Sequence, residues 1–320
     1  MCYTSIAMKI LNRDSFAATV PARPDANSFF SFYSSVWDAV TTDPALMLVP
    51  LDDHLVHRGD GVFDSAKCVG GRVFNFDAHL ARLLRCAEAI GISPPWSAAD
   101  IMAVSYETIR AGGHPDCSLR IIIARGPGSM GVAASDCPAP ALYVATYRTG
   151  PVFMDSHPGG ASLVRSELAA KPPRFATVKS CNYLQNVLMK TELAMRGADF
   201  ICSFDNAGHL AEGPTENDGI VAADGVLAFP KPDNILAGTT MARCIAYGEK
   251  LAGLGLVAGV ERRDITEADM FAAREVIVCG TTIHVVSVTS YEGRQIGDGR
   301  PGPVAAALGR MLREEMAARN

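Results

Sequence analysis

The stretch FATVKSCNYLQNVLMKTELAMRGAD, residues 175–199, places Lys179 shortly before an amphipathic helix that ends at Gly197. One face of that helix is apolar and is expected to be buried: Leu184, Val187, Leu188, Thr191 and Met195. We expect residues 174–178 to be extended, so that Lys179 lies at a strand-to-helix junction near free backbone N–H groups. The positive field there would keep the amine neutral and nucleophilic, as imine formation with an aldehyde requires. An ordinary surface lysine is the alternative.

An acidic residue, Glu212, occurs in the segment LAEGPTEND, residues 210–218. Glu212 ends a predicted strand beside Leu210 and Ala211, which suggests that its carboxylate is partly buried. A buried carboxylate needs a partner, and a protonated pyridine nitrogen is a partner that a cofactor can supply. The alternative is a turn glutamate that faces water.

Two Gly-Thr-Thr turns occur in the chain. AGTTMARC, residues 237–244, opens a helix, and CGTTIH, residues 279–284, follows an apolar strand. Glycine lets the backbone approach a ligand closely, and free N–H groups with hydroxyls are the ingredients of a phosphate site. Arg82, in the helical segment HLARLLR, is expected to clamp the same phosphate. Plain helix caps and a solvated arginine are the alternatives. Together, the lysine, the acid and the two turns fit pyridoxal 5′-phosphate.

The bulk composition restricts the class of protein. The chain has 320 residues, enough for one large domain or two ordinary ones, and 48% of them are hydrophobic. The net charge is -5 and no Lys/Arg-rich run occurs, which argues against nucleic acid or an anionic membrane as a partner. No apolar segment reaches the ~18–20 residues that a membrane helix needs, and we find no secretory signal. The nine cysteines lack metal-site spacing, so we expect no metal, reduced thiols and a cytoplasmic location.

Predicted strands and helices mix with several hairpins, which indicates a mixed α/β or α+β class. Residues 1–45 show no clear periodicity, and residues 47–52 are expected to form a buried strand. The Pro- and Gly-containing segment 149–160 is the candidate linker. It divides the chain into a smaller N-terminal α/β domain, residues 1–150, and a larger C-terminal domain, residues 151–320.

Five blocks of the chain, in this order, resemble the class IV aminotransferases, which are pyridoxal-phosphate enzymes of fold type IV. The blocks are HRGDGVFDSAKCVGGRVFNFDAHLARLLRCA, KSCNYLQNVL, GADFICSFDNAGHLAEGPTEN, ILAGTTMAR and IGDGRPGPV. DDHLVHRGDGVFD and KPPRFATVKSCNYLQNV look most similar to the plant-type D-amino-acid transaminase and 4-amino-4-deoxychorismate lyase group. The resemblance implies a two-domain fold like that of D-amino-acid aminotransferase, with the cofactor between the domains. It also implies a homodimer in which the partner lends substrate-site residues.

The resemblance further implies roles for individual residues. Lys179 would form an imine with the cofactor and move the proton between the substrate α-carbon and the cofactor, and Glu212 would bind the pyridine nitrogen. Tyr183 would contact the phenolic oxygen of the cofactor, although branched-chain enzymes carry one extra residue after the lysine. The phosphate would be held by Arg82, Thr239, Thr240, Thr281 and Thr282, with Thr239 contributing its backbone amide.

The substrate carboxylate needs a cation. Bacterial D-amino-acid enzymes use an Arg-x-His pair in the loop after an RG turn, and this chain has ARGPGSMGV there instead. Arg58, in HRGDG, is therefore the first candidate, with Arg120 and Arg125 behind it, and a structural ion pair is the alternative for each. SMGV, residues 129–132, resembles a loop of the branched-chain enzymes.

We therefore expect an aminotransferase that moves an amino group between an amino acid, D-amino acids first, and a 2-keto acid. One alternative is a 4-amino-4-deoxychorismate lyase, which gives 4-aminobenzoate and pyruvate, and another is a branched-chain L-amino-acid aminotransferase. A non-enzymatic binding protein on the same fold is disfavoured, because binding alone does not need an imine-forming lysine.

Overall fold

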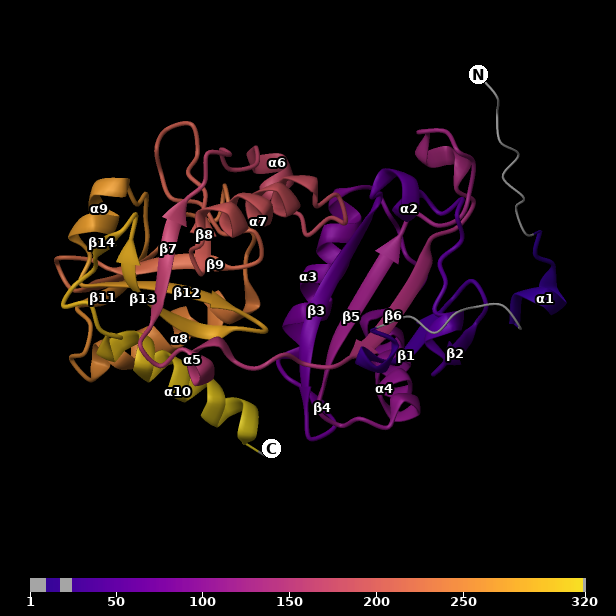
Figure 1. Ribbon diagram of the computed structural model, residues 1–320, viewed down its shortest axis with the longest axis horizontal. Helices are drawn as coiled ribbons and strands as arrows, with labels where there is room; N and C mark the ends of the chain where they lie inside the picture. The colour runs from indigo at the N-terminus through magenta and orange to yellow at the C-terminus, as the bar shows by residue number, and fades with distance from the viewer. Residues whose placement is uncertain (1–9, 18–24, 319–320) are drawn as a thin grey trace, which may run out of the picture.

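The computed structural model describes residues 10–17 and 25–318, and within these residues the strands form two sheets (Figure 1). The first sheet has six strands in the order β2-β1-β6-β5-β3-β4, and neighbouring strands are antiparallel. These strands are β1 (Phe29–Ser34), β2 (Ala39–Thr41), β3 (Gly61–Val69), β4 (Arg72–Val73), β5 (Cys117–Ala124) and β6 (Ala141–Tyr147). Together with the helices, the two sheets confirm the mixed α/β class.

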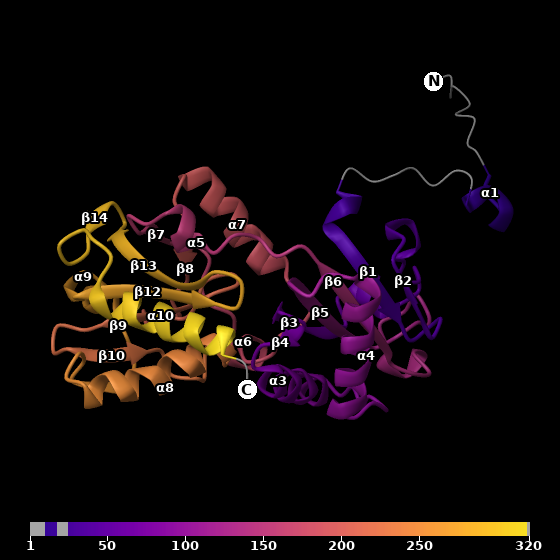
Figure 2. The ribbon, with the colours of Figure 1, turned by 90° about the horizontal axis from the view of Figure 1, so that it is seen from below.

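Two helices, α3 (Phe76–Ala89) and α4 (Ala98–Gly112), cover one face of the first sheet (Figure 2). A capping box between Ser97 and Asp100 begins α4, which satisfies backbone N–H groups that a helix start otherwise leaves unpaired. Leucine and isoleucine side chains from both helices are fully buried against the sheet, and each stabilises the fold by about 1.5–3 kcal/mol. The shorter helical pieces of this half are α1 (Arg13–Ala17), η1 (Ala26–Ser28), η2 (Pro44–Leu46), α2 (His54–Arg58) and η3 (Ala134–Asp136).

Alternation along β3 and β5 decides which side chains of the first sheet face the second sheet. Leu119 and Ile121 of β5 belong to the core with α3 and α4, whereas Arg120 between them lines a cavity on the opposite face. Phe63 and Ser65 of β3 line the same cavity. Because side chains along a strand point to alternate faces, one face of this sheet builds a core and the other contributes to a site.

The second sheet has eight strands within the described residues, and its strand order is β11-β10-β9-β12-β13-β7-β8, with β14 paired to β13. It is mixed, because β10 with β11, β13 with β7 and β7 with β8 are parallel pairs. These strands are β7 (Ala161–Arg165), β8 (Phe200–Cys202), β9 (Asn217–Val221), β10 (Val226–Phe229), β11 (Gly259–Arg262), β12 (Glu275–Gly280), β13 (His284–Tyr291) and β14 (Arg294–Gln295).

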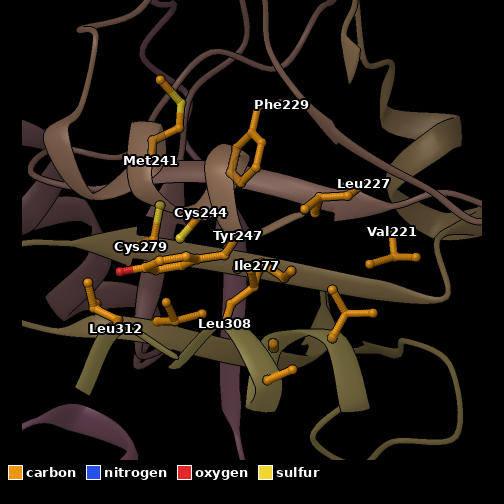
Figure 3. Packing of buried hydrophobic residues seen from close by; sticks show 14 of the residues in the cluster. Val221, Leu227, Phe229, Met241, Cys244, Tyr247, Ile277, Cys279, Leu308 and Leu312 are labelled. Carbon is orange, nitrogen blue, oxygen red and sulfur yellow. The ribbon is translucent and has the colours of Figure 1, made fainter. Parts of the chain in front are cut away.

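Two long helices, α8 (Thr239–Gly253) and α10 (Pro303–Ala317), pack on one face of the second sheet. Figure 3 shows the ring of Tyr247 from α8 among Ile277 and Cys279 of β12 and the leucines of α10, Leu308 and Leu312. This core holds the first turn of α8 and the end of β12 in place. The remaining helices of this half are α5 (Phe153–Ser156), α6 (Pro173–Ala176), α7 (Leu184–Arg196) and α9 (Glu267–Ala272).

The structure corrects the expectation for the first fifty residues. Residues 47–52 are not a strand: they follow η2 as irregular backbone, and Leu48 and Leu51 are exposed. Pro50 has no N–H to donate to a ladder. Strands β1 and β2 instead lie in residues 29–41, where the sequence showed no clear periodicity.

The first sheet uses residues 29–147 and the second uses residues 161–295, with the segment 149–160 between them. The division into domains at 150 and 151 stays a prediction. In the described part of the chain, no helix is both long and apolar enough to cross a membrane.

One buried acid of the second sheet has a consequence for stability. Asp218, on β9, is 1% exposed, and neither of its carboxyl oxygens has a hydrogen-bond partner among the described residues. Burial, with Glu216 and Glu212 nearby, raises the pKa of Asp218 well above its ordinary value. The folded chain therefore holds the proton of this carboxyl to a higher pH than the unfolded chain, which releases it above its ordinary pKa of about 4.

Because the folded state binds the extra proton, Asp218 lowers the free energy of unfolding progressively as the pH rises above that unfolded-state value. We predict that Asp218→Asn, which stays neutral at every pH, raises the Tm at pH 8 by about 2 °C or more and has less effect at pH 5. Thermal melts between pH 5 and pH 8 measure this difference. Asp233→Asn, at an exposed aspartate, is the matched control. A variant that melts below the parent at pH 8 contradicts the assignment.

Candidate active site

Lys179 is held by backbone pairing to β3. The amide of Phe63 donates to the Lys179 carbonyl at 3.0 Å, and the amide of Cys181 donates to the Gly61 carbonyl at 2.8 Å. This pairing ties the segment before α7 to the first sheet, although α7 itself packs on the second. The extended approach predicted for residues 174–178 is wrong in part, because residues 173–176 form the short helix α6.

The Lys179 side chain is enclosed by aromatic rings. Its Nζ lies 3.4 Å from the Tyr183 hydroxyl and 4.7 Å from the centroid of the Phe63 ring. Burial, followed by the positive charge of Arg82, lowers the pKa of Lys179 to about 8, against the opposing effect of Asp64 and Glu212. The sequence predicted a lowered lysine pKa from the field of a helix terminus, but burial and a neighbouring arginine are the causes here.

The buried face of α7 is not the one predicted. Its inward residues are Asn186, Met189 and Leu193, and the last two pack with Val164 and Ile201. Most of the apolar residues expected to be buried are exposed instead: Leu184, Val187, Leu188 and Met195. On the inward face Asn186 Nδ2 donates to the Pro214 carbonyl, while the apolar face lies on the surface of this chain.

Glu212 lies beside Lys179 and is fixed through a single oxygen. Its Oε2 accepts from the Leu236 amide at 2.9 Å and from Asn217 Nδ2 at 3.2 Å. Burial raises the pKa of Glu212 to about 7, although the Leu236 amide, Lys179 and Lys171 favour the carboxylate. Among the described residues Oε1 accepts no hydrogen bond, so this oxygen is left for a bound group.

A cavity of about 300 Å³ lies between the two sheets next to these groups. Seven of the residues singled out from the sequence for the cofactor line it: Arg82, Lys179, Tyr183, Thr239, Thr240, Thr281 and Thr282. Arg120 also lines it, whereas Glu212 lines an adjoining space of about 20 Å³ that shares Lys179 and Tyr183 with the main cavity. The structure thus brings residues from distant parts of the chain to one place.

The two Gly-Thr-Thr turns meet at this cavity as expected. Helix α8 begins at Thr239, its N-cap is Gly238, and no side chain caps it. A Cβ on Gly238 would lie 1.8 Å from Asn217 Oδ1, so only glycine fits there. Thr281 and Thr282 follow the end of β12. Hydroxyls from two turns and the positive N-terminus of a 15-residue helix suit an anion such as a phosphate.

A buried ion pair that the sequence analysis missed positions Arg82. Asp64 of β3 accepts from Arg82 Nε and Nη2, both at 2.8 Å, and His79 Nδ1 lies 2.7 Å from the same carboxylate. Burial alone would raise the pKa of Asp64, but Arg82 and His79 outweigh it and hold the pKa well below its ordinary value. His79 Nε2 is 3.4 Å from Thr239 Oγ1, so the network reaches the anion site.

Asp64 could have been suspected from the sequence. It lies on a strand whose period-two pattern turns it toward α3, and a buried acid needs a cationic partner such as Arg82. Asn217 and Ser65 also line the cavity, but no local pattern marks them, because their place there depends on sheet pairing.

The structure separates the three arginines proposed for a carboxylate. Arg120 lines the cavity, its guanidinium carbon lies 4.9 Å from the Phe63 ring centroid, and its Nε donates to Ser65 Oγ at 3.3 Å. Arg58 does not line the cavity and donates to backbone carbonyls, including that of Met130 at 2.7 Å. Arg125 also lies outside it.

Arg125 makes two hydrogen bonds to Asp60, at 2.9 and 3.0 Å, and two more to the carbonyls of Ile90 and Gly91. A guanidinium satisfied in this way is a structural group within the chain. Of the three arginines, Arg120 alone combines exposure to the cavity with the absence of an ion pair in the described part of the chain.

The sequence is similar to those of known aminotransferases. The amino-transferase class IV family matches residues 61–291. The D-amino-acid transaminase, chloroplastic, of Arabidopsis thaliana is 39% identical over 289 residues, which are 90% of this chain and 77% of that protein. The D-alanine aminotransferase of Bacillus licheniformis is 27% identical and covers 80% of this chain and 87% of its own length.

A solved structure shares the fold. The branched-chain aminotransferase of the thermophilic archaeon Thermoproteus uzoniensis, solved with norvaline, superposes with a TM-score of 0.80 at 23% identity. The match covers 90% of this chain and 95% of that one.

Proposed function

The chain belongs to the class IV aminotransferases, and we propose that it moves the amino group of a D-amino acid to a 2-keto acid with Lys179 as its catalytic base. The observation that carries this proposal is the convergence of Lys179, Glu212 and two hydroxyl-bearing turns on one cavity. Similarity to a D-amino-acid transaminase over 90% of the chain supports the D preference.

The residues present fit pyridoxal 5′-phosphate. Arg82, the start of α8 with Thr239 and Thr240, and the turn with Thr281 and Thr282 would hold its phosphate. The free oxygen of Glu212 would accept from its pyridine nitrogen, and Tyr183 would contact its phenolic oxygen. A cavity of about 300 Å³ is within the range for a small cofactor.

When bound, pyridoxal phosphate supplies an electron sink for the negative charge that develops at the substrate α-carbon. Lys179 moves the proton to and from that carbon. A pKa of about 8 leaves a usable fraction of neutral amine near neutral pH, where general-base catalysis is most effective. Glu212 would place its carboxyl group beside the pyridine nitrogen, where a protonated ring nitrogen would favour the carboxylate.

Arg120 is the candidate that the cavity supports for the substrate carboxylate. Its planar guanidinium can bind a carboxylate through two parallel hydrogen bonds, and it lies over the same Phe63 ring that contacts Lys179. A carboxylate bound there would hold the substrate α-carbon near the lysine amine. Arg58 and Arg125 stay predictions. Their guanidinium groups already donate hydrogen bonds within the chain, to the Met130 carbonyl and to Asp60 respectively.

The test of the reaction is turnover of the purified, cofactor-loaded protein with D-alanine and 2-oxoglutarate, compared with L-alanine and L-leucine. We expect turnover of the D-amino acid to exceed that of either L-amino acid by at least about tenfold, which corresponds to ~1.4 kcal/mol in the barrier. Lys179→Ala should lower kcat by about 1,000-fold or more, and Lys250→Ala, at an exposed lysine, should not.

Two other outcomes would overturn the D-amino-acid proposal. Faster turnover of L-leucine would identify a branched-chain activity, as in the Pseudomonas aeruginosa relative named a branched-chain-amino-acid aminotransferase, which is 26% identical. Release of 4-aminobenzoate from aminodeoxychorismate without turnover of any amino acid would identify the lyase.

Substitution of each of the three arginines by glutamine distinguishes their roles. We predict that Arg120→Gln raises the KM for 2-oxoglutarate about 10- to 100-fold, because a charge-assisted hydrogen bond contributes about 1.5–3 kcal/mol. Arg58→Gln and Arg125→Gln serve as matched variants, and their KM values should stay near that of the parent wherever they fold. Steady-state kinetics measure this, and a larger KM effect at Arg58 than at Arg120 contradicts the assignment.

We also propose that two copies of the chain form a homodimer through the apolar face of α7. Leu184, Val187, Leu188 and Met195 are 66%, 56%, 47% and 77% exposed, and contiguous exposed apolar surface marks interaction sites. The helix begins shortly after Lys179, so a second copy on this face would lie near the active site. A cytoplasmic location is likewise retained as a proposal.

Light scattering coupled to size-exclusion chromatography tests the dimer. We predict a dimer for the parent and a monomer for Leu188→Glu, because a charge buried in an apolar interface without a partner is costly. Leu254→Glu, at an exposed leucine on the end of α8, is the control. A parent that elutes as a monomer, or a dimer that survives at Leu188→Glu, argues against this interface.

A further inference from the structure

Glu212 borders a second small cavity besides the one that adjoins the cofactor site. This cavity is also lined by Lys171, Gln185, Asn186 and Asn234. The space open there to the centre of a water molecule is about 10 Å³, which is close to what one water needs. Apolar side chains such as Met189 also line it, but a buried water needs only two to four polar partners, and Lys171, Asn186 and Glu212 can supply three.

Asn186 carries a buried polar atom that needs a partner. The side chain is 6% exposed, and its Nδ2 donates to the Pro214 carbonyl. Its Oδ1 has no hydrogen-bond partner among the described residues. Leaving such an acceptor buried and unpaired is unfavourable, and a water in the cavity that Asn186 lines would pair it.

Lys171 supplies a charge on the same cavity. Its Nζ lies 4.9 Å from the centroid of the Tyr183 ring, and the ammonium makes no hydrogen bond or ion pair within the described residues. Partial burial lowers the pKa of Lys171, while Glu212 counteracts that effect. An ammonium has three N–H donors, so a water beside it would be held firmly.

We propose that one water molecule occupies this cavity, accepts a hydrogen bond from Lys171 and donates to Asn186 Oδ1 and to Glu212, and that Lys171 thereby acts as a positioning residue that keeps Glu212 a carboxylate. This inference rests on the proposed contact of Glu212 with the pyridine nitrogen of the cofactor. A water has two protons to donate, so both acceptors are satisfied at once.

The charges around Glu212 explain why a second lysine is needed. Lys179 and Lys171 favour the carboxylate, whereas burial and the neighbouring Glu216 oppose it. Lys179 lines the cofactor cavity and would be engaged by the cofactor in the proposed reaction, whereas Lys171 lines a separate cavity. Lys171 then remains as the lysine that holds the charge on the acid, and it does so without occupying the cofactor cavity.

The experiment follows the protonation of the pyridine nitrogen directly, by NMR of the holoenzyme loaded with ¹⁵N-labelled pyridoxal phosphate. Lys171→Met should move the ¹⁵N resonance toward that of the unprotonated ring and lower kcat about tenfold, the effect of one unit in a pKa, with KM changed less than twofold. Lys171→Arg should restore both readouts, and Lys250→Met, at an exposed lysine, is the matched control.

Glu212→Gln separates the failure of this inference from the failure of the proposed function. If Glu212→Gln shifts the ¹⁵N resonance and Lys171→Met does not, Lys171 has no such role. If Glu212→Gln leaves the resonance unchanged, the proposed contact of Glu212 with the ring is wrong.

A crystal structure of the parent holoenzyme tests the water without any variant. Density for one water within hydrogen-bond distance of Lys171 Nζ, Asn186 Oδ1 and Glu212 supports the proposal, and a dry cavity overturns it.

Discussion

The pairing of the Lys179 segment with β3 is the interaction on which the site depends. Two backbone hydrogen bonds join residues 179 and 181 to residues 61 and 63, although the helix that follows packs on the second sheet. This pairing sets Lys179 over Phe63. Because Asp64 is the next residue of the same strand, the anchor of Arg82 is fixed by the same backbone. The same backbone of β3 therefore positions Lys179 and Arg82, the arginine proposed to bind the phosphate.

Opposing charges around Lys179 set the pKa of its amine. Burial, Arg82 and Arg120 lower the pKa of Lys179, and Asp64 and Glu212 raise it. Asp64 is already paired with Arg82 and hydrogen-bonded to His79, so its carboxylate is engaged within the chain. Glu212 is left as the acid that can respond to a bound cofactor, and its raised pKa shows how little the cofactor-free chain stabilises that charge.

Features governed by local backbone chemistry were predictable. The helices that end at Gly113 and Gly197, and the hairpin turn at Gly70 and Gly71, lie where glycine allows a positive φ. The Gly-Thr-Thr segment at the start of α8 was also predictable, because its hydroxyls and its free backbone N–H groups belong to consecutive residues of the chain. Lys179 and Glu212 could be singled out by residue type, because a lysine can form an imine and a buried glutamate can pair with a protonated pyridine nitrogen.

The sequence by itself determined which groups could act, because a lysine, an acid and hydroxyl-bearing turns have the same chemistry wherever they lie. Only the tertiary structure decided which face of α7 packs on the second sheet: Met189 and Leu193 pack there, and Asn186 donates to the Pro214 carbonyl. It also decided which arginine faces the cavity: Arg120 does, while Arg125 is bound by Asp60. Contacts between residues far apart in the chain have no signature in local sequence, and they set the burial, charge and partners of each group.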